Sequence, residues 1–228
     1  MMTEQSTTET ADEGSASARA SRPGLGSTRS PGAGLRPAQR ARYMRIIASA
    51  EELASEGGYD AVQMRAVADR SGVALGTVYR YFPSKNHLLV VALVLEFETA
   101  AEAVTTAEIP GDGAAERLMG VLRGVMPRLS ENPLRYDALI RAAMFADASS
   151  APELDRLGEV LTLLFAQASG IDIVTEEVLN AVRIIADVWM SALVAWVAGR
   201  QSVDDVLAHM DTAVTLVFDR LNRLQRAS

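Results

Sequence analysis

The chain has 228 residues, of which 49% are hydrophobic but only 5% aromatic, and its formal net charge at pH 7 is −7. Core bulk drawn from Ala, Val, Leu and Met favours helices over sheets. There are no cysteines and two histidines, which excludes disulfides and thiolate metal sites and leaves little for a zinc site. We therefore expect no metal and no cofactor.

The sequence contains no apolar run of the ~18 residues that a membrane-spanning helix needs. Its N-terminus also lacks the basic segment followed by an apolar one that marks a signal peptide. We expect a cytoplasmic protein that does not associate with a membrane.

The negative net charge is unevenly distributed. Residues 36–95 carry eight basic and five acidic side chains, whereas residues 96–228 carry eleven arginines and twenty acids. A basic segment joined to an acidic one indicates that only the first contacts the phosphates of a nucleic acid.

The chain divides into a tail and a helical body. Residues 1–35 are rich in Ser, Thr, Ala, Gly and Arg with almost no large apolar group, which predicts a disordered tail. This tail is either an inert extension or a basic arm that follows DNA. The body begins with helices expected from residue 38 to Gly57-Gly58, over 63–71, over 75–81, and from Ser84 to about 106.

The remaining sequence is also helical in pattern, with breaks at 110–111, 132–133, 149–152, 170 and 199. Pro127 is expected to kink or end its helix. The last two helices carry apolar seams suited to packing in a bundle. One seam comprises Val178, Val182, Ile185, Trp189, Ala192 and Trp196, and the other Val203, Met210, Val214, Val217, Leu221 and Leu224. The fold class is all-α.

The segment from Gln63 to Phe82 has the layout of a helix-turn-helix, with Gly72 at the turn and Ala68 at the helix crossing. In such a motif the N-terminal end of the second helix faces the bases in the major groove. Gly76 lets the backbone come close to DNA, and Thr77 offers a hydroxyl to phosphate and a methyl group to thymine. Spacing alone leaves open that these helices form only an ordinary packed core.

A resemblance to a known family favours the helix-turn-helix over an ordinary packed core. The run VADRSGVALGTVYRYFPSKNHLL (67–89) resembles the signature of the TetR family of repressors. The resemblance implies a three-helix DNA-binding domain at 36–83 and a larger helical ligand-binding and dimerisation domain at 84–228. It also implies a homodimer, formed through the last two helices, that binds a palindromic double-stranded operator. The DNA contacts that it implies are Gln63, Leu75, Gly76, Thr77, Tyr79, Tyr81 and Lys85. Ala74 departs from the family, which often has Ser at this cap.

Three further segments, 57–70, 131–150 and 183–200, resemble TetR-family repressors of steroid catabolism. This resemblance implies that the inducer is a small apolar molecule, namely a steroid-derived acyl-CoA thioester, and that it releases the repressor from genes of sterol degradation.

A sterol-like ligand needs a long apolar cavity with a few polar anchors. The candidate lining residues are Met126, Leu129, Arg141, Met144, Phe145, Phe165, Trp189 and Trp196. The alternative is that most of these side chains form the core. Arg141 either meets the thioester or phosphates of CoA or pairs with Asp137 four residues earlier. The similarly spaced Arg183 and Asp187 are expected to form a structural pair.

Two other classes of function were weighed. A DNA-binding regulator without an inducer would have a solid C-terminal core and a pocket well below ~300 Å³. A helical enzyme is disfavoured, because the sequence has no Gly-rich phosphate loop, metal cluster or nucleophile elbow. His87 and His209 are expected at the surface.

Overall fold

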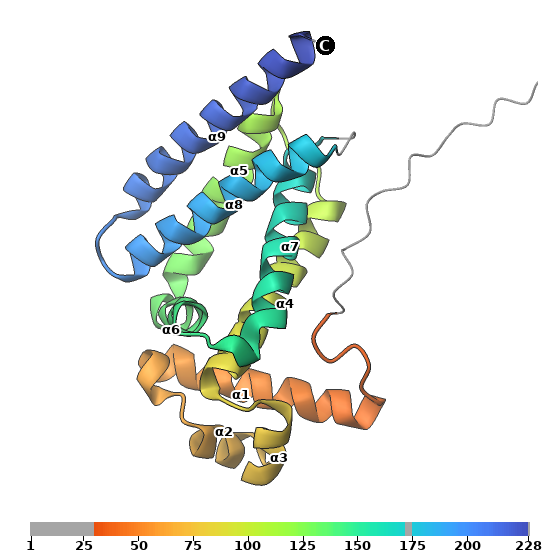
Figure 1. Ribbon diagram of the computed structural model, residues 1–228. Helices are drawn as coiled ribbons and strands as arrows, with labels where there is room; N and C mark the ends of the chain where they lie inside the picture. Colours follow the sequence, from red (N-terminus) through yellow and green to blue (C-terminus); the bar gives the residue numbers. More distant parts are fainter. Residues whose placement is uncertain (1–29, 172–174, 228) are drawn as a thin grey trace, which may run out of the picture.

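A computed structural model describes residues 30–171 and 175–227, and within these ranges the regular structure is entirely helical (Figure 1). A three-helix unit forms one end of the molecule, and the other helices lie on one side of it. The helices are α1 (Pro37–Ala61), α2 (Met64–Ser71), α3 (Leu75–Tyr81), α4 (Lys85–Thr106), α5 (Ala114–Glu131), α6 (Pro133–Met144), a 3₁₀ turn η1 (Ala148–Ser150), α7 (Ala151–Ala168), α8 (Glu176–Val197) and α9 (Val203–Ala227). The predicted all-α fold class is confirmed.

Local signals in the sequence explain where the first helices end. Gly72 ends α2 in the left-handed conformation, at φ 65°, and its N–H donates to the Ala68 carbonyl. The Ser84 side chain accepts a hydrogen bond from the His87 N–H and so caps α4. At Gly57 and Gly58 the helical backbone is interrupted, as predicted, but a further turn continues α1 to Ala61.

Pro127 does not end its helix. It lies inside α5, which continues to Glu131, so the prediction of a helix end at this residue is wrong. Pro127 is on the exposed face of the helix. There the carbonyl that loses its hydrogen-bond donor can be solvated, which lowers the cost of a proline in the last turns.

The segment 30–35, which the sequence assigned to the tail, folds back on the helices. The Ser30 hydroxyl donates to Glu98 of α4 at 2.6 Å, and Leu35 packs against the core. Residues 1–29, which make up most of the predicted tail, lie outside the described residues.

An almost fully buried ion pair joins α4 to α7. Arg156 has 4% of its side chain exposed and donates to Glu98, which has 13% exposed, at 2.7 Å. Arg156 also contacts Glu159 one turn later at 3.6 Å. Helix α7 packs more extensively against α4 than against any other helix. The Arg156–Glu98 pair therefore holds the two helices of this interface in position along each other.

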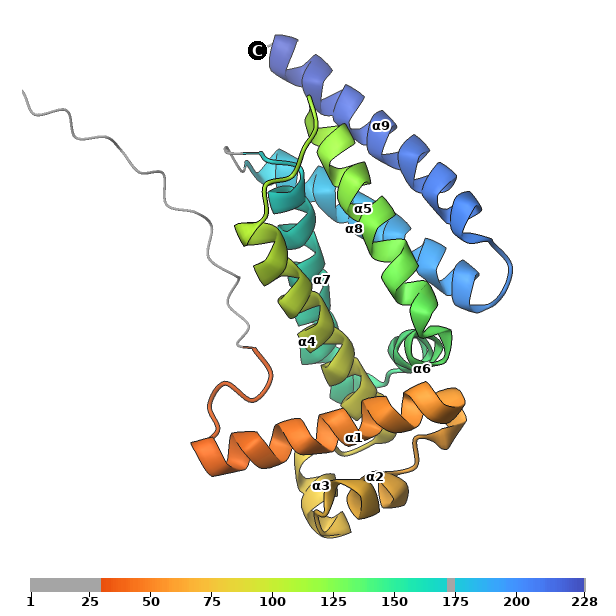
Figure 2. The same cartoon turned by 180° about the vertical axis from the view of Figure 1, so that it is seen from behind.

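The last two helices pack on each other and on the rest of the chain. In Figure 2, α9 lies along α5, and its contacts extend to α8 as well. The predicted seam residues Val178, Val182, Ile185 and Trp189 of α8 are buried, as are Met210, Val214 and Leu221 of α9. By length and hydropathy alone α8 is long enough to cross a membrane, but the buried core helix of a soluble protein meets the same criterion.

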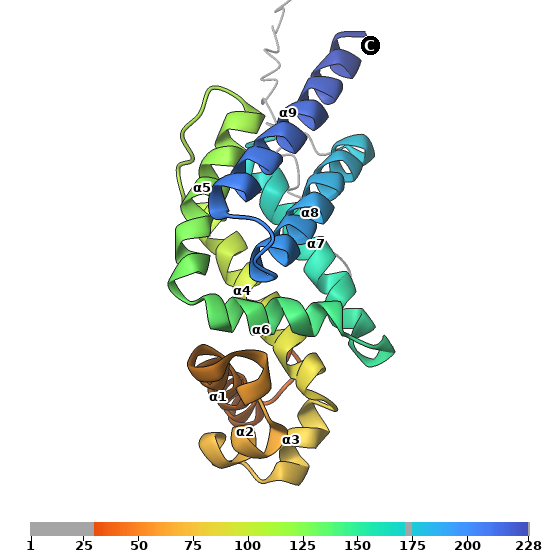
Figure 3. The same ribbon diagram turned by 90° about the vertical axis from the view of Figure 1, so that its left-hand side faces the viewer.

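Helix α6 crosses between α1 and the long helices, as Figure 3 shows, and a charged network holds it there. Arg135 of α6 donates to Glu51 of α1 at 2.5 Å and to Glu96 of α4 at 2.7 Å. The Tyr136 hydroxyl donates to the other oxygen of Glu96. Burial by itself raises the pKa of Glu96, but Arg135 and Tyr136 outweigh it and leave that pKa below its ordinary value of 4.5. Burial, reinforced by the bond to Glu96, raises the pKa of Tyr136 to about 12.

We predict that Glu96 contributes a pH-dependent part of the free energy of unfolding. Its lowered pKa in the folded state means that this contribution is fully present above pH 4.5, the ordinary value, and is lost as the pH falls through the folded-state pKa. Glu96→Gln should cost roughly 1–2 kcal/mol at pH 7, since the side chain is partly exposed. Urea unfolding at pH 7 and near pH 3.5 checks this. An equal difference between the two proteins at both pH values would contradict it.

Candidate functional site

The helix-turn-helix predicted from the sequence is formed by α2, Gly72 and α3. One side of α3 is anchored by Val78, which is fully buried. The opposite side is open to solvent and carries Leu75, Gly76, Tyr79 and Arg80. Tyr79 is 49% exposed. An exposed face on the second helix of this motif is the surface that enters the major groove.

Gly76 is the most open point of this face. A Cβ atom added to it would meet no heavy atom within 4 Å, so glycine is not required here by packing within the chain. A requirement for glycine would therefore come from close approach of the backbone to DNA. Thr77 beside it is half-buried. Ala74 is the N-cap of α3 and provides no side-chain hydrogen bond.

Three of the seven predicted DNA contacts, Tyr81, Lys85 and Gln63, have side chains that are buried or in contact with other parts of the protein. The Tyr81 hydroxyl is buried without a hydrogen-bond partner, and its ring packs edge-on against Tyr43 at 5.7 Å. In this structure the Tyr81 hydroxyl is not exposed for the predicted contact with phosphate, and that contact stays a prediction. The Lys85 ammonium lies 3.7 Å from the centre of the Tyr59 ring and donates to the Tyr59 carbonyl at 3.3 Å. Lys85 reaches phosphate only if it leaves this contact.

The remaining predicted contact, Gln63, is exposed just before α2, and its amide donates to the Asp60 carbonyl. Sequence reasoning missed Arg80, which is exposed on α3 directly after Tyr79. The sequence itself offered a reason to include Arg80, because an arginine guanidinium on a recognition helix can bind both phosphate and guanine.

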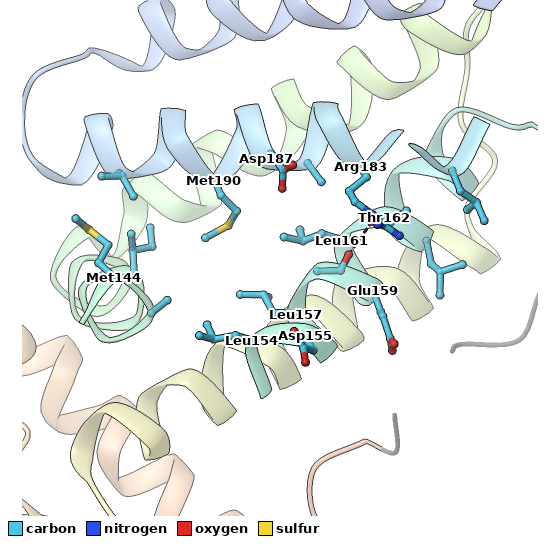
Figure 4. Close-up of a pocket in the computed structure, with 17 residues that line it drawn as sticks. Met144, Leu154, Asp155, Leu157, Glu159, Leu161, Thr162, Arg183, Asp187 and Met190 are labelled. Atoms are coloured by element: carbon cyan, nitrogen blue, oxygen red, sulfur yellow. Dashed lines mark hydrogen bonds between the residues drawn. The ribbon is translucent and has the colours of Figure 1, made fainter. Parts of the chain in front are cut away.

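The second candidate site is a pocket of about 910 Å³ in the regulatory domain, between α6, α7 and α8 (Figure 4). Most of its wall is apolar. The lining residues are Ile140, Ala143, Met144, Leu154, Asp155, Leu157, Gly158, Glu159, Leu161, Thr162, Leu163, Leu179, Arg183, Ala186, Asp187, Met190 and Val194. This volume lies within the range of ~300–1,000 Å³ typical of small-molecule sites.

The polar groups of the pocket are unevenly placed. Figure 4 shows Met144 and Met190 toward one end and Arg183 beside Thr162 toward the other. Arg183 is the one cation among the described lining residues. No ion pair joins it to Asp187 in the described structure, so the expected structural pair is not formed. Three carboxylates, Asp155, Glu159 and Asp187, also line the wall, so the pocket combines an apolar end with one cation and three acidic side chains.

Of the eight predicted ligand contacts, only Met144 lines this pocket. Met126, Leu129, Phe165 and Trp189 are buried in the core instead, and the Phe165 and Trp189 rings pack edge-on at 6.5 Å. Helical periodicity identifies the inward face of a helix, but it does not show whether that face meets a neighbour or a cavity.

The other three residues also lie outside the pocket wall. Phe145 is 63% exposed, and its carbonyl accepts a hydrogen bond from the Asn86 side chain at 2.8 Å. Trp196 is half-buried against the core. Arg141 donates to Asp137 at 2.7 Å, which is the alternative that the four-residue spacing offered.

Comparison with known proteins identifies related families in both parts of the chain. The model of "Bacterial regulatory proteins, tetR family" matches residues 46–92, and "Tetracyclin repressor-like, C-terminal domain" matches residues 111–217. The HTH-type transcriptional repressor KstR of Rhodococcus jostii is 46% identical over 181 residues, which cover 79% of this chain and 84% of that protein.

Solved structures share the fold. A TetR transcriptional regulator from Rhodococcus sp. RHA1 superposes with a TM-score of 0.72 at 32% identity, covering 79% of this chain and 97% of that one. Thermus thermophilus FadR, solved in complex with lauroyl-CoA, has a TM-score of 0.57 at 20% identity, covering 77% and 93%. The chain belongs to the TetR family and is a transcriptional repressor of that family.

Proposed function

We propose that this repressor binds a palindromic operator as a homodimer in the cytoplasm and is released from it by a steroid-derived acyl-CoA bound between α6, α7 and α8. The observation that carries the proposal is the 46% identity to KstR, which extends through both domains. The ligand class comes from the resemblance to repressors of steroid catabolism. The structure of FadR with lauroyl-CoA shows an acyl-CoA bound to a protein of this fold.

The pocket suits the steroid part of such a ligand in size and in its largely apolar wall. Its volume of about 910 Å³ is well above the ~300 Å³ below which a regulator without an inducer would be favoured. Met144 and Met190 give the apolar end a wall that repacks easily around a rigid ring system. Arg183 replaces Arg141 as the proposed contact for the thioester oxygen or the phosphates.

The proposed dimer uses the outer faces of α8 and α9. Ile184 of α8 is 55% exposed and Leu216 of α9 is 64% exposed, whereas the predicted seams are largely occupied within the chain. Two recognition helices on such a dimer must lie ~34–36 Å apart to enter successive major grooves. Tilting of α4, which runs unbroken from Lys85 to Thr106, would change this spacing. The ligand must then bind the splayed state more tightly than the DNA-competent one.

A mobility-shift titration tests the proposal. The DNA comes from upstream of the neighbouring genes, and the effectors are a steroid acyl-CoA, the free steroid acid and CoA alone. We expect a specific shift that only the thioester abolishes. Arg183→Met should raise the thioester concentration required by about tenfold, since a charge-assisted hydrogen bond contributes ~1.5–3 kcal/mol. A mobility shift that none of the three effectors changes would contradict the proposed inducer but would still support operator binding.

A further inference from the structure

A pair of side chains forms one of the connections between the wall of the pocket and the recognition helix. Glu153 lies in the first turn of α7, next to the pocket-lining Leu154 and Asp155. Its Oε1 atom is 3.3 Å from Nε2 of His87, and only 21% and 12% of the two side chains are exposed. His87 lies in the first turn of α4, where Ser84 caps its N–H.

The contact continues from His87 into the DNA-binding domain. The His87 ring lies 6.0 Å from the ring of Phe82, the residue that ends α3. Phe82 is fully buried and stacks on Tyr43 of α1 at 4.7 Å. Glu153, His87 and Phe82 therefore form a continuous series of contacts from the start of α7 to the base of the recognition helix.

Both members of this pair have a further buried polar atom without a hydrogen-bond partner. In the described part of the chain five side-chain atoms have this property, and four of them belong to the pair or to residues near it in the sequence. They are Tyr81 Oη, His87 Nδ1, Ser150 Oγ and Glu153 Oε2. A buried polar atom without a partner costs free energy. An arrangement that gave these atoms partners would remove this cost, and two such arrangements are what a two-state element requires.

We propose that the Glu153–His87 pair transmits occupancy of the pocket to the recognition helix and sets how strongly an effector changes operator affinity. This rests on the operator-binding function proposed above but not on the identity of the inducer. Both residues are positioning residues, since they act on DNA binding only through Phe82 and α3.

The test needs a way to fill the pocket that does not depend on the inducer. Gly158 lines the pocket, and a Cβ atom added to it would meet nothing within 4 Å. Gly158 is exposed, so Gly158→Phe adds a ring at the open side of the pocket wall. Operator affinity is measured by fluorescence anisotropy, with and without this substitution. The backgrounds are the unsubstituted chain, Glu153→Gln, His87→Gln and the double variant.

We expect Gly158→Phe to weaken operator binding about tenfold in the unsubstituted chain, within the range of typical allosteric couplings. The factor should fall to about threefold or less in each single variant and no further in the double variant, as for two residues that act through one contact. Asp211→Asn is the control. It removes the Arg123–Asp211 ion pair between α5 and α9 and should keep the full response.

An undiminished response in both single variants would overturn the proposal, and so would an unsubstituted chain that is insensitive to Gly158→Phe. A merely structural role would change melting temperature and basal affinity but not the response factor. If Gly158→Phe acts while the steroid acyl-CoA does not, the inducer proposal fails and the proposed link stands.

Discussion

Replacing Gly76 with glutamate is expected to reduce operator affinity by at least about 100-fold while leaving the fold intact. The added side chain meets nothing within the protein, but on DNA it would place bulk and negative charge where α3 approaches the duplex. A 100-fold loss corresponds to about 2.7 kcal/mol, and a dimer suffers it in both half-sites. Anisotropy with operator DNA at fixed salt measures the loss.

The matched control is Gly120→Glu. Gly120 is likewise helical, exposed and free of contacts that an added Cβ would disturb, but it lies in α5, away from the recognition helix. Both variants should match or exceed the stability of the unsubstituted chain, because glutamate favours a helix over glycine by up to about 1 kcal/mol. If Gly76→Glu bound the operator normally, α3 would not be the DNA-reading helix.

Arg156→Met is expected to destabilise the protein by about 3–5 kcal/mol, the usual cost of leaving a buried charge without its partner. The substitution preserves most of the volume and removes the guanidinium from Glu98. The Ser30 hydroxyl then remains as a donor to that carboxylate. Urea unfolding at one protein concentration measures the change in the free energy of unfolding.

The double variant Glu98→Leu with Arg156→Met distinguishes the charge from the packing. It removes both charges and should regain most of the lost stability, since a buried pair replaced by apolar groups is often nearly neutral. Additive losses in the double variant would show that the two residues contribute through separate contacts. Arg123→Met, at an exposed pair with Asp211, should cost less than about 1 kcal/mol.

Much of the fold and one of the two sites could be predicted from the sequence, because their causes are local. Gly72 ends α2 in a conformation that glycine adopts readily, and Ser84 caps α4 with its own side chain. The same locality places Gly76 and Tyr79 on the open side of α3, since a seven-residue helix anchored by Val78 has only one exposed face.

Features that depend on how distant helices meet were decided only by the tertiary structure. Periodicity marked Phe165 and Trp189 as inward-facing, but whether they meet each other or a cavity depends on the approach of α7 to α8. Whether the Tyr81 hydroxyl is buried or exposed likewise depends on the position of α1, since the Tyr81 ring packs against Tyr43. The pairing of Glu153 with His87 joins residues 66 positions apart. Such contacts are set by packing geometry, which residue spacing along one helix does not encode.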